Sequence, residues 1–168
     1  MGVAGSGKTT VGAALGRALG WPFFDGDKFH SQANVDKMAQ GVPLTDADRA
    51  PWLQRLNHLL ADKLAAGQSI VLACSALKES YRRTLQGDLD VSFVYLKGSF
   101  ELVNSRLKDR PGHYLPPGLL QSQFDALEEP AKAVAVDVKK NVDDIVLEVL
   151  FRLAFSAVSA PPPLIRPR

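Results

Sequence analysis

The first nine residues carry the pattern of a phosphate-binding loop. Residues 2–9, GVAGSGKT, match G-x-x-x-x-G-K-[ST], and a helical pattern follows directly. Glycines permit positive φ angles, so consecutive backbone N–H groups can point at phosphate oxygens. The next helix would direct its positive dipole end at the same anion. We therefore predict a nucleotide site formed by Gly2, Val3, Ala4, Gly5, Ser6, Gly7, Lys8 and Thr9.

Two side chains of this loop have expected roles of their own. Lys8 would supply a positive charge for the β- and γ-phosphates, and Thr9 a hydroxyl ligand for Mg²⁺. A chance glycine-rich turn is the alternative interpretation, and the periodic helix that opens here counts against it. The motif alone does not distinguish a kinase from a GTPase or another ATPase.

An acidic stretch, DGDKFH, follows the short strand that we predict over residues 22–24. Ligands of open α/β sheets bind beyond the carboxyl ends of the strands. Asp25 and Asp27 could there hold Mg²⁺ and orient or deprotonate an attacking hydroxyl. A solvated Asp-Gly-Asp turn is the alternative, which the phosphate loop makes the weaker one. His30 is compatible with a loop hydrogen bond or a substrate contact.

Basic residues follow further along the chain. Arg49 ends the stretch TDADR, and its guanidinium could bind a carboxylate or phosphate or support a helix start. Lys78 follows a predicted buried strand over 69–74, so we expect it near the phosphate loop. Arg106 and Arg110 lie one helical turn apart and are consistent with a lid or a solvated basic helix end.

The alternation of strands and helices predicts how these residues are positioned. We expect strands over 22–24, 69–74, 91–98 and 133–138. The predicted helices cover 8–19, 31–41, a segment with Pro51 in its first turn, 75–86, 99–110, 119–130 and 142–155. Such alternation predicts an α/β fold with a parallel sheet and helices on both faces.

Composition sets the outer limits. The 168 residues, 46% apolar, suit one domain, which we place at 1–155 with a proline-rich, unstructured tail at 156–168. A net charge of +2 argues against a nucleic-acid partner. The single Cys74 predicts a small buried residue in a reducing compartment. No secretory signal or membrane-length apolar run is present, so we expect a cytoplasmic protein.

Several stretches together resemble the gluconate kinases, small P-loop kinases related to shikimate kinase. They are GVAGSGKTT, DGDKFH, PLTDADRAPWL, CSALKESYRR, VYLKGSFE, SRLKDRPGH and LLQSQFDALEEP. The resemblance implies ATP-dependent phosphorylation of the 6-hydroxyl of D-gluconate, a P-loop kinase sheet with a lid, ATP and Mg²⁺ as cofactors, and a homodimer.

The same resemblance assigns roles by position. Asp27 would bind the sugar hydroxyls and act as general base, with Asp25 near the metal. Arg49 would receive the substrate carboxylate, Arg106 would contact adenine, and Arg110 would act from the lid beside Lys8. Further substrate contacts, less closely tied to the motifs, would be His30, Lys78 and His113.

The chain departs from the gluconate kinase pattern before the phosphate loop. Relatives have an apolar strand there, in the middle of the sheet, and only Met1 stands in this position. The strands at 70–74 and 92–96 would then flank a gap. Three functions remain open: a gluconate kinase, a kinase for another small molecule such as shikimate, and a non-catalytic or poorly folded isoform.

Overall fold

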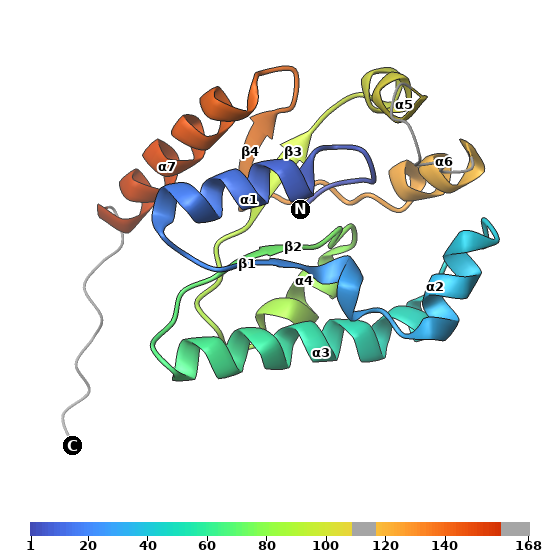
Figure 1. Cartoon of the computed structure of the whole chain (residues 1–168), viewed down its shortest axis with the longest axis horizontal. Coiled ribbons are helices and arrows are strands. Elements are labelled where there is room, and N and C mark those ends of the chain that lie inside the picture. Colours follow the sequence, from blue (N-terminus) through green and yellow to red (C-terminus); the bar gives the residue numbers. More distant parts are fainter. Residues whose placement is uncertain (109–116, 159–168) are drawn as a thin grey trace.

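The computed structural model describes residues 1–108 and 117–158, arranged around two small parallel sheets (Figure 1). In one sheet β1 (Phe23–Asp25) pairs with β2 (Val71–Ala73), with Phe24 opposite Leu72. In the other, β3 (Val94–Lys97) pairs with β4 (Val134–Asp137), with Tyr95 opposite Ala135. The predicted α/β class with parallel strands is confirmed, and so is the gap between the second and third strands.

Helices cover both faces of the strands. α1 (Lys8–Leu19) packs against β1, β2 and α7 (Val142–Val158), while α3 (Asp46–Ala65) packs against α4 (Glu79–Gln86) on the opposite side (Figure 1). The remaining helices are α2 (Gln32–Ala39), η1 (Gly26–Phe29), α5 (Phe100–Lys108) and α6 (Pro117–Asp125). None of the helices in the described part of the chain is long and apolar enough to cross a membrane.

The core is divided into three apolar clusters. Val11 and Leu15 of α1 pack with β3, β4 and α7, whereas Trp52 and Leu56 of α3 pack with β2 and α4. A third cluster joins Val3 of the phosphate loop to α5 and α6. Burial of a single large apolar side chain contributes roughly 1.5–3 kcal/mol, so these clusters supply most of the stabilisation.

A backbone link through Met1 and Gly2 joins the two sheets. The Leu96 N–H donates to the Met1 carbonyl at 3.0 Å, and the Gly2 N–H donates to the Ser75 carbonyl at 3.2 Å. The Met1 amino group donates to the Val94 carbonyl at 2.5 Å. Met1 therefore occupies a strand position beside β3, between sheets that are otherwise separate (Figure 1).

Several predicted boundaries need correction. α3 begins at Asp46, so Pro51 lies inside the helix and not in its first turn. The cause is a capping box in which Thr45 and Asp48 exchange side-chain-to-backbone hydrogen bonds. α4 begins at Glu79 and not at residue 75, because Ala76 has φ 45° and Lys78 is extended, and neither conformation is helical. α7 continues to Val158, past the predicted helix end at 155.

Removal of the α3 cap should measurably destabilise the fold. Thr45→Ala deletes the side chain that accepts from the Asp48 N–H, and we expect the free energy of unfolding to fall by about 1 kcal/mol. Urea denaturation followed by circular dichroism measures this. Thr10→Ala, at an exposed position inside α1, is the control and should change little. An equal loss in both variants would contradict the capping role.

Candidate active site

The phosphate loop has the backbone conformation that its glycines predict. Gly2, Gly5 and Gly7 have φ angles of 145°, 76° and 93°. A Cβ atom on Gly5 would lie 2.7 Å from Cγ of Leu107, so the end of α5 packs directly on the loop. The Ser6 hydroxyl is buried without a hydrogen-bond partner among the described residues. The loop therefore has the geometry and the spare polar group expected of a phosphate cradle.

Lys8 lies across the loop that precedes it. Its Nζ donates to the Val3 carbonyl at 2.9 Å. Burial lowers the pKa of Lys8, and the carboxylates of Asp27 and Asp25 partly oppose that shift. Lys8 therefore lies close enough to both aspartates to interact with their charges. The position of the aspartates at the carboxyl end of β1 predicts this proximity.

Thr9 and Asp25 form a pair suited to a metal ion. The Thr9 hydroxyl donates to Oδ2 of Asp25 at 2.9 Å, and Oδ1 of Asp25 accepts from the Asp27 N–H at 3.2 Å. No group of three His, Cys, Asp or Glu residues in the described segments could hold a metal ion by itself. Mg²⁺ commonly takes one or two protein oxygens and completes its shell with phosphate and water, so this pair fits it.

His30 lies on a buried tryptophan. Its ring stacks on Trp52 with centroids 4.2 Å apart and planes 16° apart, and Asn34 lies 3.5 Å from its Nδ1. Burial lowers the pKa of His30; the Asp27 carboxylate opposes this shift, and the positive charge of Arg49 adds to it. The histidine is therefore oriented by its neighbours and lies between the acidic turn and the start of α3.

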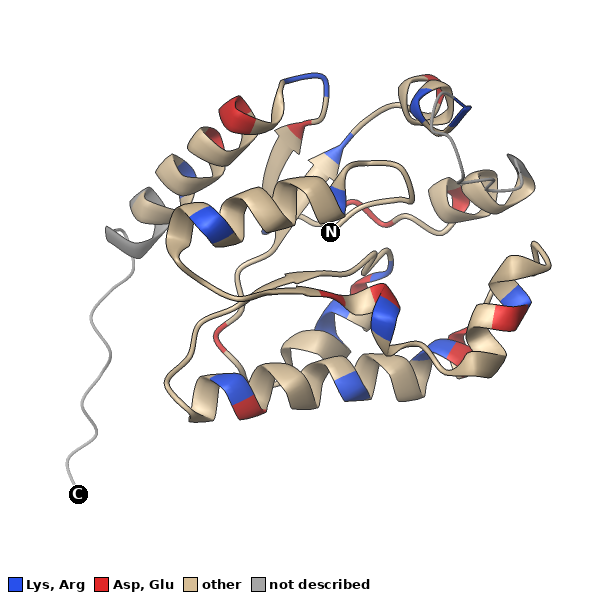
Figure 2. Cartoon of the chain, viewed as in Figure 1, with Lys and Arg blue, Asp and Glu red and all other residues tan. Residues whose placement is uncertain are grey.

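Arg49 and Lys78 meet around one acidic residue. Lys78 Nζ donates to both carboxylate oxygens of Asp46, at 2.8 and 2.9 Å. Tyr81 donates its hydroxyl to the same carboxylate, and the Arg49 guanidinium lies 5.7 Å from the centre of the Tyr81 ring. Arg49 also donates to the Leu44 carbonyl. Figure 2 shows charged residues in η1 and at the start of α3.

These contacts also shift the pKa values of the cluster. Hydrogen bonds from Lys78 and Tyr81 lower the pKa of Asp46, and the bond to Asp46 raises the pKa of Lys78. Both groups are therefore charged at neutral pH. The cluster is a pair of cations, Arg49 and Lys78, partly neutralised by a single exposed carboxylate.

Arg106 contacts the segment that follows β4. Arg106 Nη2 donates to the Val138 carbonyl at 2.7 Å, in the segment after β4, and its neighbour Leu107 contacts the phosphate loop. The last turn of α5 therefore packs on the loop through Leu107, while the Arg106 guanidinium contacts the segment after β4. Arg110 and His113 lie outside the described residues.

Three residues that contact the site were not predicted from the sequence. Tyr81 connects Asp46 to Arg49, Trp52 supports His30 and donates to the Gly26 carbonyl at 2.8 Å, and Gln123 accepts from the Ala4 N–H at 2.7 Å. Tyr81 and Trp52 occupy apolar positions of helical patterns, so the sequence does not indicate that their polar atoms also make hydrogen bonds in the site. Gln123 comes from α6, 119 residues away from the loop that it contacts.

Cys74 is the buried residue that the sequence predicts. Its side chain is 4% exposed, and burial raises the pKa of the thiol to about 12. A thiol with this pKa is protonated at neutral pH and is a poor nucleophile.

Comparisons with known proteins place this chain in a family. The model of the shikimate kinase family matches residues 4–147. A gluconokinase from Gluconobacter oxydans is 48% identical, over 90% of this chain and 87% of its own, and a probable gluconokinase from Xenopus tropicalis is 46% identical over 89% and 88%. The chain belongs to the gluconokinase family. A gluconokinase crystal structure from Sinorhizobium meliloti, 44% identical, superimposes with a TM-score of 0.85 over 94% of this chain and 91% of that one.

Membership of the gluconokinase family confirms the resemblance drawn from the sequence and identifies the chain as a P-loop kinase. ATP is the phosphate donor expected of such a kinase, commonly with Mg²⁺. Lys78 of this cluster follows β2 along the chain, at the edge of the sheet where open α/β proteins bind ligands.

The contact between Gly5 and Leu107 can be tested with a matched pair of glycines. Gly5 and Gly20 both have positive φ, 76° and 68°, but a Cβ on Gly20 would meet nothing within 4 Å. Gly5→Ala should weaken ATP binding at least tenfold, because the loop must shift away from α5. Gly20→Ala should lower stability by about 1–2 kcal/mol and leave ATP affinity unchanged. Calorimetric titration with ATP measures both, and equal affinities would contradict the packing argument.

Proposed function

We propose that this chain phosphorylates the 6-hydroxyl of D-gluconate with ATP, giving 6-phosphogluconate and ADP. The observation that carries the proposal is the convergence of three groups of residues: the phosphate loop with Lys8, the acidic turn with Asp27, and the cations Arg49 and Lys78. A sugar acid needs a cation for its carboxylate and acceptors for its hydroxyls, and this arrangement offers both beside a nucleotide site. The identity of 46–48% to gluconokinases supports the same substrate.

The nucleotide half of the site would work mainly by positioning and by charge. Backbone N–H groups of the loop and the Lys8 ammonium would bind the β- and γ-phosphates. Thr9 and Asp25 would hold Mg²⁺, which when bound neutralises negative charge on the phosphates. Arg106 would contact the adenine. Arg110 is proposed as a further cation from the lid, on the family resemblance alone.

Asp27 is the proposed general base. Its carboxylate would accept the proton of the 6-hydroxyl as that oxygen forms a bond to the γ-phosphorus, while the bond from this phosphorus to the ADP oxygen breaks. ADP leaves with the electron pair of the broken bond. The side chain is exposed at the end of β1 and near Lys8, so it can reach a substrate next to the γ-phosphate.

Arg49 and Lys78 are the proposed partners of the substrate carboxylate. Lys78 is held by Asp46, and Tyr81 keeps the Arg49 guanidinium over its ring, so both cations have fixed positions. His30 would contact a substrate hydroxyl from its stack on Trp52, and His113 is a further proposed contact. The substrate is thus a small acid. We also propose a homodimer, on the family resemblance, and a location in the cytoplasm, on the free thiol of Cys74.

Replacement of the proposed base should abolish most turnover. Asp27→Asn keeps the size of the side chain and removes its basicity, so we expect kcat to fall by about 10²–10⁴ with little change in the thermal midpoint. Gluconate-dependent ADP release at saturating ATP measures kcat. Asp62→Asn, at an exposed position in α3, is the control. Turnover that survives within a few-fold in Asp27→Asn would show the assignment to be wrong.

Removal of the Arg49 guanidinium should affect one substrate selectively. Arg49→Ala removes a charged hydrogen-bond donor, so the KM for gluconate should rise at least tenfold while the KM for ATP stays within about twofold. Arg55→Ala, exposed on the same helix, should leave both constants unchanged. Equal increases for gluconate and ATP would contradict a role in carboxylate binding.

A further inference from the structure

Asn34 is a buried polar residue that contacts His30 from the first turn of α2. It is 5% exposed, and its backbone N–H donates to the Ser31 hydroxyl at 3.3 Å. A buried amide side chain requires hydrogen-bond partners. The partners of Asn34 therefore determine which end of its amide faces the histidine.

The backbone carbonyl of Asp48 fixes the orientation of this amide. Nδ2 of Asn34 donates to that carbonyl at 2.9 Å. A carbonyl oxygen carries no proton, so only the NH₂ end of the amide can face it. The start of α3 is tied to α2 a second time, because Lys37 Nζ donates to the Asp48 carboxylate at 2.7 Å. The amide is thus held with its second N–H available to His30.

This amide selects one protonation state of the His30 ring. Nδ2 of Asn34 lies 3.5 Å from Nδ1 of His30. A proton on Nδ1 would point at the NH₂ group, and two donors that face each other repel, whereas a bare Nδ1 accepts the N–H of the amide. The proton of the neutral ring therefore lies on Nε2. Burial lowers the pKa of His30, which likewise disfavours a ring with protons on both nitrogen atoms.

Two further contacts hold the ring beside the acidic turn. The His30 N–H donates to the Asp27 carbonyl at 3.3 Å, and the ring stacks on Trp52. The Trp52 indole N–H in turn donates to the Gly26 carbonyl at 2.8 Å. A stack fixes the plane of the imidazole but not the nitrogen that carries the proton. Asn34 supplies that choice.

We propose that Asn34 is a positioning residue for the acceptor substrate: it keeps His30 as a neutral Nε2–H donor, which binds a hydroxyl oxygen of gluconate. The inference rests on the proposed function, in which Asp27 accepts the proton of the 6-hydroxyl. A hydroxyl group is donor and acceptor at once, so a carboxylate and an N–H donor are complementary partners for it. An Nε2 that carries a proton has no lone pair for another, which leaves Asp27 as the base.

The tautomer of His30 can be measured without nucleotide or gluconate. Long-range ¹H–¹⁵N spectra of the chain labelled in its three histidines distinguish protonated from bare ring nitrogens, and His30→Phe assigns the signals. At about pH 9, well above the ordinary histidine pKa of about 6.5, we expect the proton on Nε2. Asn34→Asp places an acceptor beside Nδ1 and should move the proton there. Asn34→Leu, which neither donates nor accepts, should give a mixture of both tautomers.

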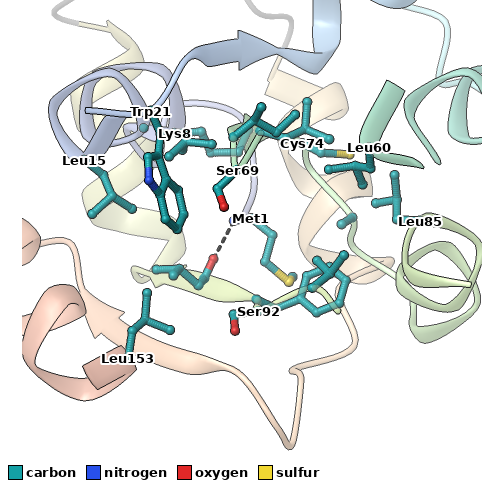
Figure 3. Close-up of a pocket in the computed structure, with 18 of the residues that line it drawn as sticks. Met1, Lys8, Leu15, Trp21, Leu60, Ser69, Cys74, Leu85, Ser92 and Leu153 are labelled. Atoms are coloured by element: carbon teal, nitrogen blue, oxygen red, sulfur yellow. Dashed lines mark hydrogen bonds between the residues drawn. The ribbon is translucent and has the colours of Figure 1, made fainter. Parts of the chain in front are cut away.

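Gluconate affinity tests the consequence for the substrate. Trp52 fluorescence reports binding because the indole stacks on His30, and Trp21→Phe removes the second tryptophan, which lines a recess between β2 and β3 with Leu15 (Figure 3). In this background Asn34→Asp should weaken gluconate binding at least tenfold and change ATP affinity by less than about twofold. His30→Phe keeps an aromatic ring for the stack and has no tautomers. With it, Asn34→Asp should change gluconate affinity by less than about twofold.

Three results would overturn the proposal. They are a proton on Nδ1 in the unaltered chain, the same tautomer in the unaltered chain and both Asn34 variants, and an equal loss of gluconate affinity from Asn34→Asp with and without His30. The last result would assign the loss to the added charge or to the lost bond to Asp48. Absent gluconate binding with the Nε2–H tautomer intact would contradict the proposed substrate and leave the action of Asn34 on His30 standing.

Discussion

The position of the phosphate loop depends on the backbone of Met1 and Gly2, which forms the hydrogen-bonded link between the two sheets. Each such bond contributes only about 0.5–1.5 kcal/mol net, less than the burial of Val11 or Leu15 in the core. Apolar packing of α1 therefore holds the halves together, whereas the hydrogen bonds fix where the chain enters the loop. A small shift at Met1 would be carried directly to Gly5 and Lys8.

The active site is assembled from both halves of this arrangement. Asp25 ends β1, Asp27 lies in η1 and Lys78 follows β2, while the loop is supported from the other side by Leu107 and Gln123. Phosphoryl transfer depends on positioning and charge neutralisation, so relative movement of the halves would change the distance between donor and acceptor groups.

Local patterns in the sequence predict the parts of this site that are close along the chain. The helix at 8–19 and the conformation of the loop glycines follow from motif and periodicity. Tyr81 and Trp52 could not be assigned in this way, because a buried aromatic residue in a helix has the same pattern whether or not its polar atom serves a site. Pro51 was misplaced because the capping box at Thr45, visible in the sequence, outweighs the preference of proline for a first turn.

The central claim is that this chain, with its phosphate loop held between two sheets, transfers phosphate from ATP to gluconate. The most direct measurement is ADP release by the unaltered chain with ATP and Mg²⁺, compared across gluconate, shikimate and no acceptor. The account predicts saturable release that depends on gluconate and exceeds the shikimate rate by at least tenfold. Release that is equal in all three conditions, or absent although the chain is folded and binds ATP, would contradict it.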